Sequence, residues 1–297
     1  MHGESAHVNI GVAEVEQIAA LGWRGLEEAH LGSWLLRAAD GFTGRSNSAL
    51  VLGDALISDA GWESAGWVSA IEHWYAERGL PPMVQVPLPG GEAVDAVLAA
   101  AGWRTHDLVR FLTGDIDEVQ KLASAAQSLR SEGPPVSNLL AQGVLHSERS
   151  EASAHLDAEP DDAWLAAYHY RGAALPPTAR AVLLRAGEAT ELCFGSIRAA
   201  EPDGGGDAVL GVARGAVGQG WLGVTAVTVA DQHRRRRYGT WLMSELATWG
   251  AQHGARWIYL QVAADNAAAL QLYKRLGFHH HHDYRYRAGP VPEAPSA

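Results

Sequence analysis

The stretch that decides the fold runs from Asn266 to Phe278 and reads NAAALQLYKRLGF. Asn266 is of a residue type favoured at the N-terminal cap of a helix, because its side chain can accept a hydrogen bond from an unpaired helix amide. Gly277 is of the type that commonly ends a helix. The stretch therefore predicts a helix from Asn266 to Leu276 that ends at a glycine turn.

Outward from this helix, the second half of the chain alternates between strand-like and helix-like runs. Strands are predicted at Ala181–Arg185, Glu191–Arg198, Ala208–Val217, Trp221–Val229, Trp257–Val262 and Asp283–Arg287. Further helices are predicted near Asp161–Trp164, with an acidic first turn, and at Tyr238–Gln252. Glycine-rich turns at Gly204–Gly206 and Gly218–Gly220 separate the earlier strands. This order predicts an α/β (α+β) fold with a mixed, mostly antiparallel sheet flanked by helices.

The same order of elements occurs twice along the chain. In each copy a helix ends at a glycine, in His73–Gly79 and in Thr248–Gly254, and a strand follows, at Met83–Val86 and at Tyr259–Val262. A second helix then ends at Gly102-Trp103 in the first copy and at Gly277-Phe278 in the second. Each copy closes with a strand that carries an arginine, at Val109–Phe111 and at Tyr284–Tyr286. Matches that keep one order predict a tandem duplication of one domain.

A linker is predicted between the two copies, because Ser131–Ser137 holds two prolines and a glycine in a polar context. We expect a first domain over residues 1–130, a linker over 131–150 and a second domain over 151–289. The proline- and alanine-rich end, residues 290–297, is predicted to be disordered.

Composition limits the partners of the chain. Its formal net charge of −11 disfavours general binding to nucleic acid or anionic membrane and suits a cationic substrate. The single cysteine, Cys193, excludes an internal disulfide and is expected to be a core residue. No apolar stretch approaches the length of a membrane span, and no signal peptide is visible at Met1–Ser5, so a cytoplasmic protein is expected.

A basic turn follows the strand-like run Val227–Val229 and opens the helix at Tyr238. The first amides of a helix have no internal partner and lie at the positive end of its dipole, and Arg234 to Arg237 add charge beside them. Gly239 allows the backbone to approach a ligand closely. The turn therefore suits a phosphate, although the arginines alone are also compatible with a solvated charge run or an RNA-binding patch.

Together these segments resemble the GNAT superfamily of N-acetyltransferases over roughly Trp164 to Arg287, in its tandem-domain actinobacterial form. The stretch from Asn266 matches the family pattern N-x-x-A-x-x-L-Y-x-x-x-G-F at every fixed position. The basic turn occupies the family's R/Q-x-x-G-x-G/A phosphate loop, with Arg237 where the first glycine is expected. This departure removes backbone freedom, so the Arg237 side chain must point away from the pyrophosphate or clamp it.

The resemblance implies an acyl-CoA-dependent N-acyltransferase that transfers acetyl from acetyl-CoA to an amine by direct attack, without a metal. The acetyl group and the pantetheine arm are implied to lie along the backbone of the fourth strand, where an amide can hold the oxyanion. The residues implied to bind acetyl-CoA are Val227, Thr228, Val229, Arg234, Arg235, Arg236, Arg237, Tyr238, Gly239, Thr240, Asn266 and Tyr273.

The resemblance implies functional roles for two residues of the Asn266 helix, and each residue also has a purely structural explanation. Tyr273 is implied to be catalytic, as the donor of a proton to the departing thiolate. Its alternative is an aromatic side chain that packs on the sheet. Asn266 is implied to hydrogen-bond the pantetheine or the strand end, and it is also a natural helix cap.

The general base is not identified by the sequence. Trp221–Val229 holds no carboxylate, and Glu191 and Asp231 are the nearest candidates, although acidic side chains usually lie at the surface. A chain of waters is an equal alternative. The run His279–His282 lies inside the domain, where alternate residues of a strand face opposite sides, so no metal is expected there.

The first half is expected to keep the fold without the acyl-CoA site. Aligning Gly102 with Gly277 places Leu98 opposite Tyr273 and Gly91 opposite Asn266, and an acidic segment at Asp54–Gly61 replaces the arginine loop. The tryptophans of this half are expected in the core or between the halves: Trp62, Trp67, Trp74 and Trp103. Arg45–Ser48 is either a polar turn or faces a cleft between the halves.

Two other function classes compete with the enzyme. One is a non-catalytic acyl-CoA sensor in which Arg237 blocks turnover, and the other is a nucleic-acid-binding protein that uses the arginine run. The presence of Tyr273 favours the enzyme, and the net charge of −11 disfavours nucleic acid. The sequence leaves the acceptor, a small-molecule or protein amine, and the oligomeric state open.

Overall fold

The structure is a computed structural model that describes residues 8–53, 66–131, 152–169, 172–200 and 207–290. Its elements are α1 (Val12–Gly22), β1 (Glu27–Leu31), β2 (Trp34–Ala38), η1 (Arg45–Asn47), β3 (Ala49–Leu50), α3 (Gly66–Ala76), β4 (Met83–Leu88), α4 (Glu92–Ala100), β5 (Arg104–Asp115), α5 (Ile116–Ser131), β6 (Ser153–Asp157), α6 (Asp162–Ala167), α7 (Ala179–Leu184), β7 (Glu191–Ala200), β8 (Asp207–Gly218), β9 (Trp221–Val229), η3 (Asp231–His233), α8 (Tyr238–Gln252), β10 (Trp257–Ala263), α9 (Ala267–Arg275) and β11 (His279–Ala288). Among the described helices, none has both the length and the apolar character to cross a membrane.

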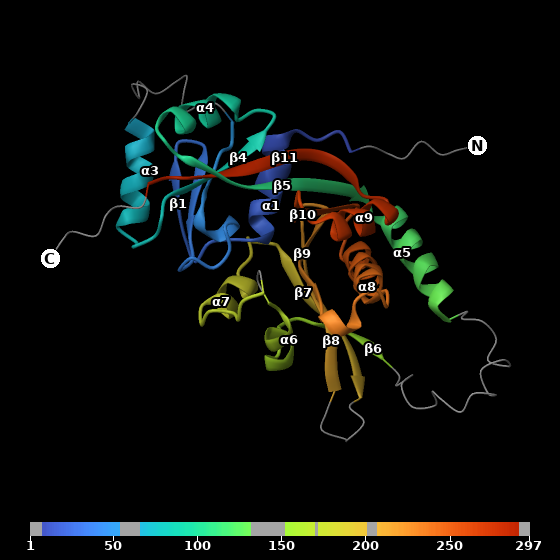
Figure 1. Cartoon of the computed structure of the whole chain (residues 1–297). Coiled ribbons are helices and arrows are strands. Elements are labelled where there is room, and N and C mark those ends of the chain that lie inside the picture. Colours follow the sequence, from blue (N-terminus) through green and yellow to red (C-terminus); the bar gives the residue numbers. More distant parts are fainter. Residues whose placement is uncertain (1–7, 54–65, 132–151, 170–171, 201–206, 291–297) are drawn as a thin grey trace, which may run out of the picture.

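One mixed sheet of 11 strands joins both halves, in the order β1-β2-β3-β4-β11-β5-β10-β9-β8-β7-β6. Strand β5, from the first half, lies between β10 and β11 of the second half. Strand β11, from the second half, lies between β4 and β5 of the first half. Each half therefore gives its last strand to the other half, and Figure 1 shows β5 and β11 side by side across the middle of the molecule.

The register of the exchanged strands is symmetric. Val109 faces Tyr284, and these two residues lie at equivalent places after Gly102 and Gly277 (109 − 102 = 284 − 277). The strands beside this pair follow the same rule, because Arg110 faces Val262 and Arg285 faces Val86. A pseudo-two-fold axis thus passes between β5 and β11, which supports the predicted duplication.

The helices before these strands are also equivalent. Gly91 caps α4 and Asn266 caps α9, where the asparagine side chain accepts from Ala269 N at 3.1 Å. Gly102 and Gly277 end the two helical segments with φ of 81° and 82°, a conformation that favours glycine. Leu98 is fully buried in α4, at the place that Tyr273 takes in α9.

Two layers of helices cover the second-half strands. On one face, α5, α8 and α9 pack around Leu222, Ile258 and Cys193, so Cys193 is a core residue as predicted. Burial raises the pKa of the Cys193 thiol to about 12. On the other face, α6, α7 and the first-half helix α1 pack against the sheet. Helix α5 thus closes the core of the half to which it does not belong in sequence.

The first half has its own core between β4, α3 and α4. Trp67 and Trp103 are buried in it, as predicted, and Trp74 packs partly buried against it. Trp62 and the acidic segment Asp54–Gly61 lie outside the described residues. The predicted linker, apart from Ser131 at the end of α5, and the tail beyond Pro290 also lie outside them.

One predicted strand is wrong. Ala181–Arg185 is not a strand, because residues Ala179–Leu184 form the helix α7. A short apolar run does not distinguish the two structures by periodicity alone. In the fold, the run buries Ala179, Val182 and Leu183, which share one face of a helix. The last strand is also longer than predicted, because β11 begins at His279 and includes the whole histidine run.

Polar contacts link β11 to α1 and α4 of the first half. Asp95 of α4 accepts from Arg287 Nε at 2.8 Å and Nη2 at 2.9 Å, and this arginine lowers the pKa of the Asp95 carboxyl. Glu16 of α1 is buried and lies 3.0 Å from His282 Nε2 of β11. These side chains position the exchanged strand by charge as well as by backbone pairing.

Candidate functional site

The sheet opens between β9 and β10. The two strands pair in parallel from Trp221 and Trp257 to Val224 and Leu260, where their register ends. Strand β9 continues to Val229 and stays paired with β8 on its other edge. The edge of β9 from Thr225 to Val229 therefore presents backbone groups to the opening, where a ligand can satisfy them.

A β-bulge lies at the start of this open edge. Thr225 pairs with Arg214 and Thr228 pairs with Val212, so Ala226 and Val227 both lie opposite one residue of β8. Ala226 has a φ of 55°, which is uncommon for a residue other than glycine. Because a bulge changes the direction of backbone groups and concentrates at functional sites, it marks this edge as a candidate site.

The basic turn joins the end of β9 to the start of α8. Helix α8 begins at Tyr238, and its first intrahelical bond runs from Trp241 N to Arg237 O at 3.0 Å. The amides of Tyr238, Gly239 and Thr240 are therefore the unpaired first donors of a 15-residue helix. They lie at the positive end of its dipole, which suits a phosphate group.

Arg237 has a left-handed backbone conformation, which glycine adopts most readily, and it stands where the family pattern has a glycine. Its φ is 65°, and Arg235 also has a positive φ of 62°. Both residues therefore lie in the left-handed region, which L-residues rarely adopt and which concentrates at functional sites. The Arg237 side chain turns toward α5 and donates from Nη1 to Ala126 O at 2.6 Å, so it points away from the turn rather than clamping a ligand.

The other residues of the turn divide into exposed and buried groups. Arg235 and Arg236 are exposed, whereas Arg234 forms an ion pair with Asp231 at 2.7 Å. Tyr238 and Thr240 bury their side chains, so only their backbone groups are available to a ligand. The predicted site residues of β9, Val227, Thr228 and Val229, are all half-buried.

Tyr273 lies on α9 with its ring in the main core. The ring packs edge-on against Phe278 at 5.6 Å, and the residue is 6% exposed. Burial raises the pKa of its hydroxyl to about 12, so the hydroxyl keeps its proton at neutral pH. Helix α9 also borders the start of α8, because a Cβ built on Gly239 would lie 3.4 Å from Leu272 Cδ2. Tyr273 thus has a core role and remains a candidate proton donor.

The face of the sheet opposite α8 receives residues from the first half. The turn η1 places Arg45 beside β10, where its Nη1 donates to Gln261 Oε1 at 3.0 Å. The Tyr284 hydroxyl of β11 donates to the same oxygen at 3.0 Å. Of the predicted alternatives for Arg45–Ser48, the polar turn is confirmed, because Ser46 to Ser48 are buried in it, while Arg45 contacts Gln261 of the other half.

Arg214 of β8 is a buried charge that the sequence analysis missed. It is fully buried beneath Trp23, and it donates to three carbonyl oxygens, those of Leu183, Gly22 and Arg185. Burial lowers the pKa of its guanidinium to about 10. An arginine inside an otherwise apolar strand is the sequence feature that could have indicated a buried charge. The sequence does not show on which face of the sheet its side chain lies.

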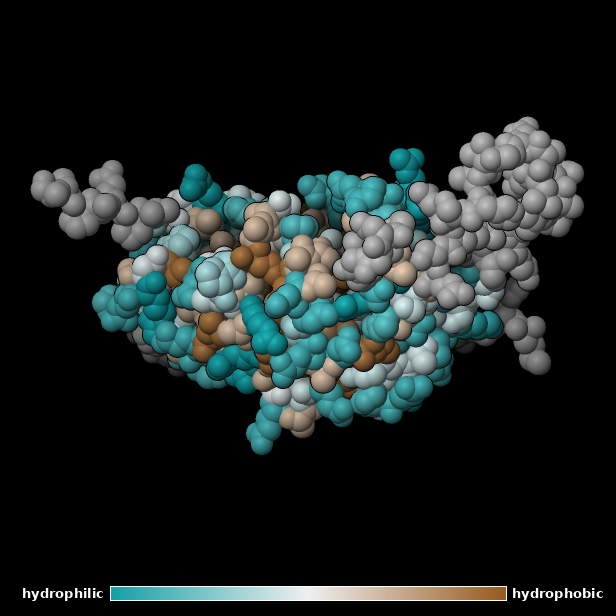
Figure 2. Space-filling model, turned by 90° about the horizontal axis from the view of Figure 1, so that it is seen from below, coloured by the Kyte–Doolittle hydropathy of each residue, from teal (hydrophilic) through white to brown (hydrophobic). Residues whose placement is uncertain are grey.

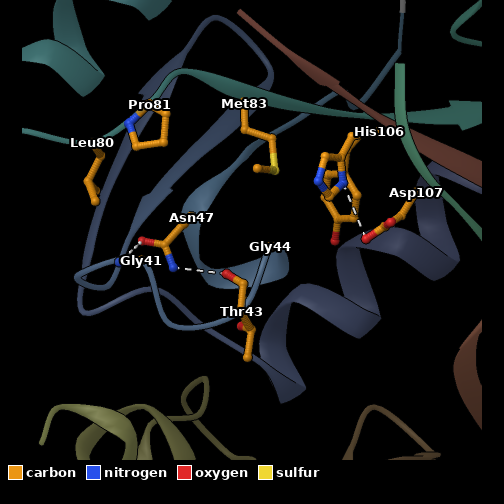
Figure 3. A pocket seen from close by; sticks show the side chains of 10 residues that line it. Gly41, Thr43, Gly44, Asn47, Leu80, Pro81, Met83, His106 and Asp107 are labelled. Atoms are coloured by element: carbon orange, nitrogen blue, oxygen red, sulfur yellow. Dashed lines mark hydrogen bonds and ion pairs between the residues drawn. The ribbon is translucent and has the colours of Figure 1, made fainter. Parts of the chain in front are cut away.

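A cavity of about 190 Å³ lies next to the η1 turn. Figure 3 shows its wall, with Thr43, Gly44 and Asn47 on the turn side and His106 and Asp107 of β5 opposite them. The Asn47 side chain accepts from Ala39 N and Gly41 N and donates to Phe42 O and Thr43 O, which fixes the turn. Gly44 packs directly on the Tyr286 ring, since a Cβ there would lie 3.0 Å from Tyr286 Cζ. Elsewhere, the surface seen from below is mostly hydrophilic with small separated apolar patches (Figure 2).

The two carboxylates suggested by the sequence differ in position, since Glu191 lies near the start of β9 and Asp231 lies two residues beyond its open end. Glu191 is exposed near the other end of the sheet, since it pairs with Val217, which pairs with Leu222. Asp231 is exposed and paired with Arg234. The histidines of β11 bond to Asp283, Glu16 and Ile10, and the described residues contain no group of three or more side chains arranged to hold a metal.

Comparison with known sequences identifies relatives over most of the chain. A family model described as "Probable histone acetyltransferase Rv0428c C-terminal" matches residues 11–287. A protein of Mycobacterium tuberculosis named "Probable histone acetyltransferase Rv0428c" is 29% identical over 281 residues, which are 93% of this chain and 73% of that protein. An "Uncharacterized N-acetyltransferase YobR" of Bacillus subtilis is 22% identical over 93% of this chain and 98% of that protein.

Solved structures share the fold. A GCN5-related N-acetyltransferase from Kribbella flavida aligns with a TM-score of 0.60 and 17% identity over 95% of this chain and 96% of its own. A tandem GNAT protein from the clavulanic acid biosynthesis pathway aligns with a TM-score of 0.57 and 16% identity over 96% of this chain and 89% of its own. These likenesses confirm the GNAT fold and agree with the tandem arrangement.

Proposed function

The chain belongs to the GNAT family described as "Probable histone acetyltransferase Rv0428c C-terminal", and from this premise we propose that it transfers acetyl from acetyl-CoA to an amine. The observation that carries the proposal is the opening between β9 and β10, which holds a bulged edge and ends at the start of α8. A thioester could lie along the edge while its pyrophosphate binds the first amides of the helix.

The residues of the opening suit direct transfer. The nitrogen of a neutral amine attacks the thioester carbonyl carbon, and the carbonyl oxygen takes up the negative charge. A backbone amide of the β9 edge between Ala226 and Val229 stabilises that oxyanion. The intermediate collapses when the carbon–sulfur bond breaks, and the thiolate takes a proton from the Tyr273 hydroxyl. The amine loses its own proton to water, since Glu191 lies near the other end of β9 and the exposed Asp231 carboxylate is paired with Arg234.

The two halves have different proposed roles. The second, residues 151–289, holds the acetyl-CoA site, with the arginine turn, Asn266 and Tyr273. The first, residues 1–130, has Leu98 in place of the tyrosine and supplies structure and the η1 turn instead. The relative from M. tuberculosis is named a histone acetyltransferase, so a basic lysine peptide belongs among the acceptors to be tested, beside small amines.

Substitution of Tyr273 by phenylalanine tests the proposal. Tyr273→Phe removes the hydroxyl and keeps the ring in the core, so we expect the dissociation constant for acetyl-CoA to stay within about twofold while kcat falls about 10²-fold. Calorimetry and steady-state kinetics with an accepted amine measure the two quantities. Because the pKa of the hydroxyl is about 12, the wild-type donor stays protonated throughout pH 6–9.

The control is Phe278→Leu, which disturbs the same ring contact without removing a hydroxyl. An unchanged kcat in Tyr273→Phe would remove the proton-donor role. Binding of acetyl-CoA without turnover of any amine would instead favour the non-catalytic sensor.

A further inference from the structure

Two arginines from different halves surround the indole of Trp23 on the face of the sheet opposite α8. The Cζ atoms of Arg45 and Arg214 lie 4.9 and 5.1 Å from the centroid of the ring. They are close enough that Arg45 lowers the pKa of Arg214, in addition to the larger effect of burial. Two guanidinium groups from different halves thus share one ring in a chain whose net charge is −11.

Arg214 has neutral partners. Its described hydrogen bonds go to the three backbone carbonyls already named, and within the described residues no carboxylate lies within ion-pair distance of it. A buried charge without a counter-charge is unfavourable, because the low-dielectric interior does not screen it. An anionic group bound nearby would supply the missing charge.

Arg45 is the more accessible member of the pair. It is half-buried, whereas Arg214 is fully buried. The turn that carries it is fixed on both sides, by the four hydrogen bonds of Asn47 and by the bond from Trp23 Nε1 to Thr43 Oγ1 at 3.1 Å. A guanidinium held on such a turn is preorganised for a charge-assisted contact with a carboxylate or phosphate.

The position of Arg45 relates it to the opening. Gln261, which accepts from Arg45, follows directly after Leu260, the last residue of β10 that pairs with β9. Thr225 is the first residue of β9 without a partner in β10, and on the other edge of β9 it pairs with Arg214 of β8. The two arginines thus flank the place where β9 and β10 separate, on the face that α8 and α9 leave to the acceptor.

A cavity lies beside the turn that carries Arg45, although Arg45 itself is not among the residues that line it. Gly41, Thr43 and Gly44 belong to the segment that carries Arg45, and they form one wall of the cavity of about 190 Å³ (Figure 3). Met83 and Tyr286 line it as well. This volume suits a single side chain or a small molecule rather than a folded partner.

We propose that the acceptor carries an acidic group beside its amine, and that the first half recognises this group through Arg45. The inference rests on the proposed acetyl transfer and names the class of acceptor for it, an amine with a carboxylate or a phosphate. Gln261 and Trp23 hold the Arg45 guanidinium, and Arg214 adds to its field from below. Arg45 is a specificity residue that the first half contributes to the site of the second.

Matched acceptors test the proposal. Leucine and phenylalanine are compared with their amides, and O-phosphoethanolamine with ethanolamine, at saturating acetyl-CoA. In the wild-type protein, kcat/KM should be about 10- to 100-fold higher for the acidic member of at least one pair, as expected for a charge-assisted contact. Which pair shows the preference distinguishes a carboxylate from a phosphate.

Variants of Arg45 locate the preference. Arg45→Gln keeps a donor for Gln261 and should remove the preference by raising KM for the acidic amine, while Arg45→Lys keeps part of it. Arg180→Gln is the matched control, because it removes one exposed arginine from the neighbouring helix α7, where Arg180 pairs with Glu159. Thermal midpoints equal to that of the wild type establish that each variant is folded.

Binding of a product gives a readout that does not need turnover. N-acetylleucine should bind more tightly than N-acetylleucinamide in the presence of coenzyme A, and Arg45→Gln should abolish the difference. The proposal of an acidic acceptor is overturned if the two products bind equally well. It is also overturned if the amides or a basic lysine peptide are acetylated faster than the acids. Neither outcome contradicts acetyl transfer itself. Failure to bind acetyl-CoA in calorimetry would remove the proposed function itself.

Discussion

The backbone of Arg237 shows how a single residue can depart from a family pattern and still serve the same geometry. A left-handed conformation costs an L-residue about 1–2 kcal/mol relative to glycine. Here the side chain donates to Ala126 O, and such a bond contributes about 1 kcal/mol. The two contributions are of similar size, so the turn keeps a glycine-like shape without a glycine.

Substitution of Arg237 separates its backbone from its side chain. Arg237→Gly relieves the left-handed cost but loses the bond to Ala126, so we expect the free energy of unfolding to change by less than about 1 kcal/mol. Arg237→Val loses the same bond and adds a branched side chain at φ 65°, so it should be about 1–2 kcal/mol less stable than the glycine variant. Urea unfolding measures both. Equal stability of the two variants would contradict a role for the backbone conformation.

At the scale of elements, the proposed anion site has two parts, the turn and the start of α8. In this proposal the amides of Tyr238, Gly239 and Thr240 act at short range and depend on backbone access. The exposed side chains of Arg235 and Arg236 then act at long range through solvent. Salt separates the two contributions, because it screens exposed charges over about 10 Å at 0.1 M and hardly affects a steric contact.

Charge reversal and steric obstruction should therefore respond differently to salt. We expect the double variant Arg235→Glu, Arg236→Glu to weaken coenzyme A binding about tenfold at low ionic strength and less than about threefold at high ionic strength. Gly239→Val should weaken it at both, since the branched side chain blocks the approach of the phosphates to the amides. Dissociation constants from calorimetry at two salt concentrations distinguish these outcomes.

Gly239→Ala is the matched control for the obstruction. The added Cβ meets Leu272 at 3.4 Å, an ordinary contact, so the variant should fold normally and bind with an intermediate constant. Normal binding of coenzyme A by Gly239→Val would mean that the phosphates lie elsewhere.

At the scale of the whole molecule, the strand exchange makes the two halves one folding unit. Among the strands that the structure describes, β5 pairs only with β10 and β11, and β11 pairs only with β4 and β5, so neither has a described neighbour from its own half. Helix α5 buries Ile116 and Val119 in the core of the other half. An isolated half would expose unpaired strand edges and apolar faces, which favour aggregation.

Two fragments that end on either side of the linker test this dependence. Residues 1–131 and 152–297, produced together, should copurify as a 1:1 complex that melts in one transition, because the exchanged strands and α5 join them. Each fragment produced alone should be insoluble or lack a cooperative transition. A fragment that folds alone with native stability would show that the exchange is dispensable.

The sequence predicted those parts of the fold that depend on neighbouring residues. The helix Tyr238–Gln252 and the N-cap Asn266 follow from local patterns, and the structure has both. The run Ala181–Arg185 could not be assigned in the same way, because four apolar residues in a row satisfy a buried strand and a buried helix equally. Only its burial under the sheet decides for α7.

The sequence by itself determined the family and the duplicated order of elements, because each is recorded in local spacing, and the acyl-CoA site residues that it names stay a prediction. Tertiary structure alone decided that β5 and β11 change places, since two strands of similar pattern pair equally well with either half until the whole sheet forms. It alone brought Arg45 within 3.0 Å of Gln261, across 216 positions of sequence. Contacts between distant segments depend on how faces pack, and no local pattern of residues records that.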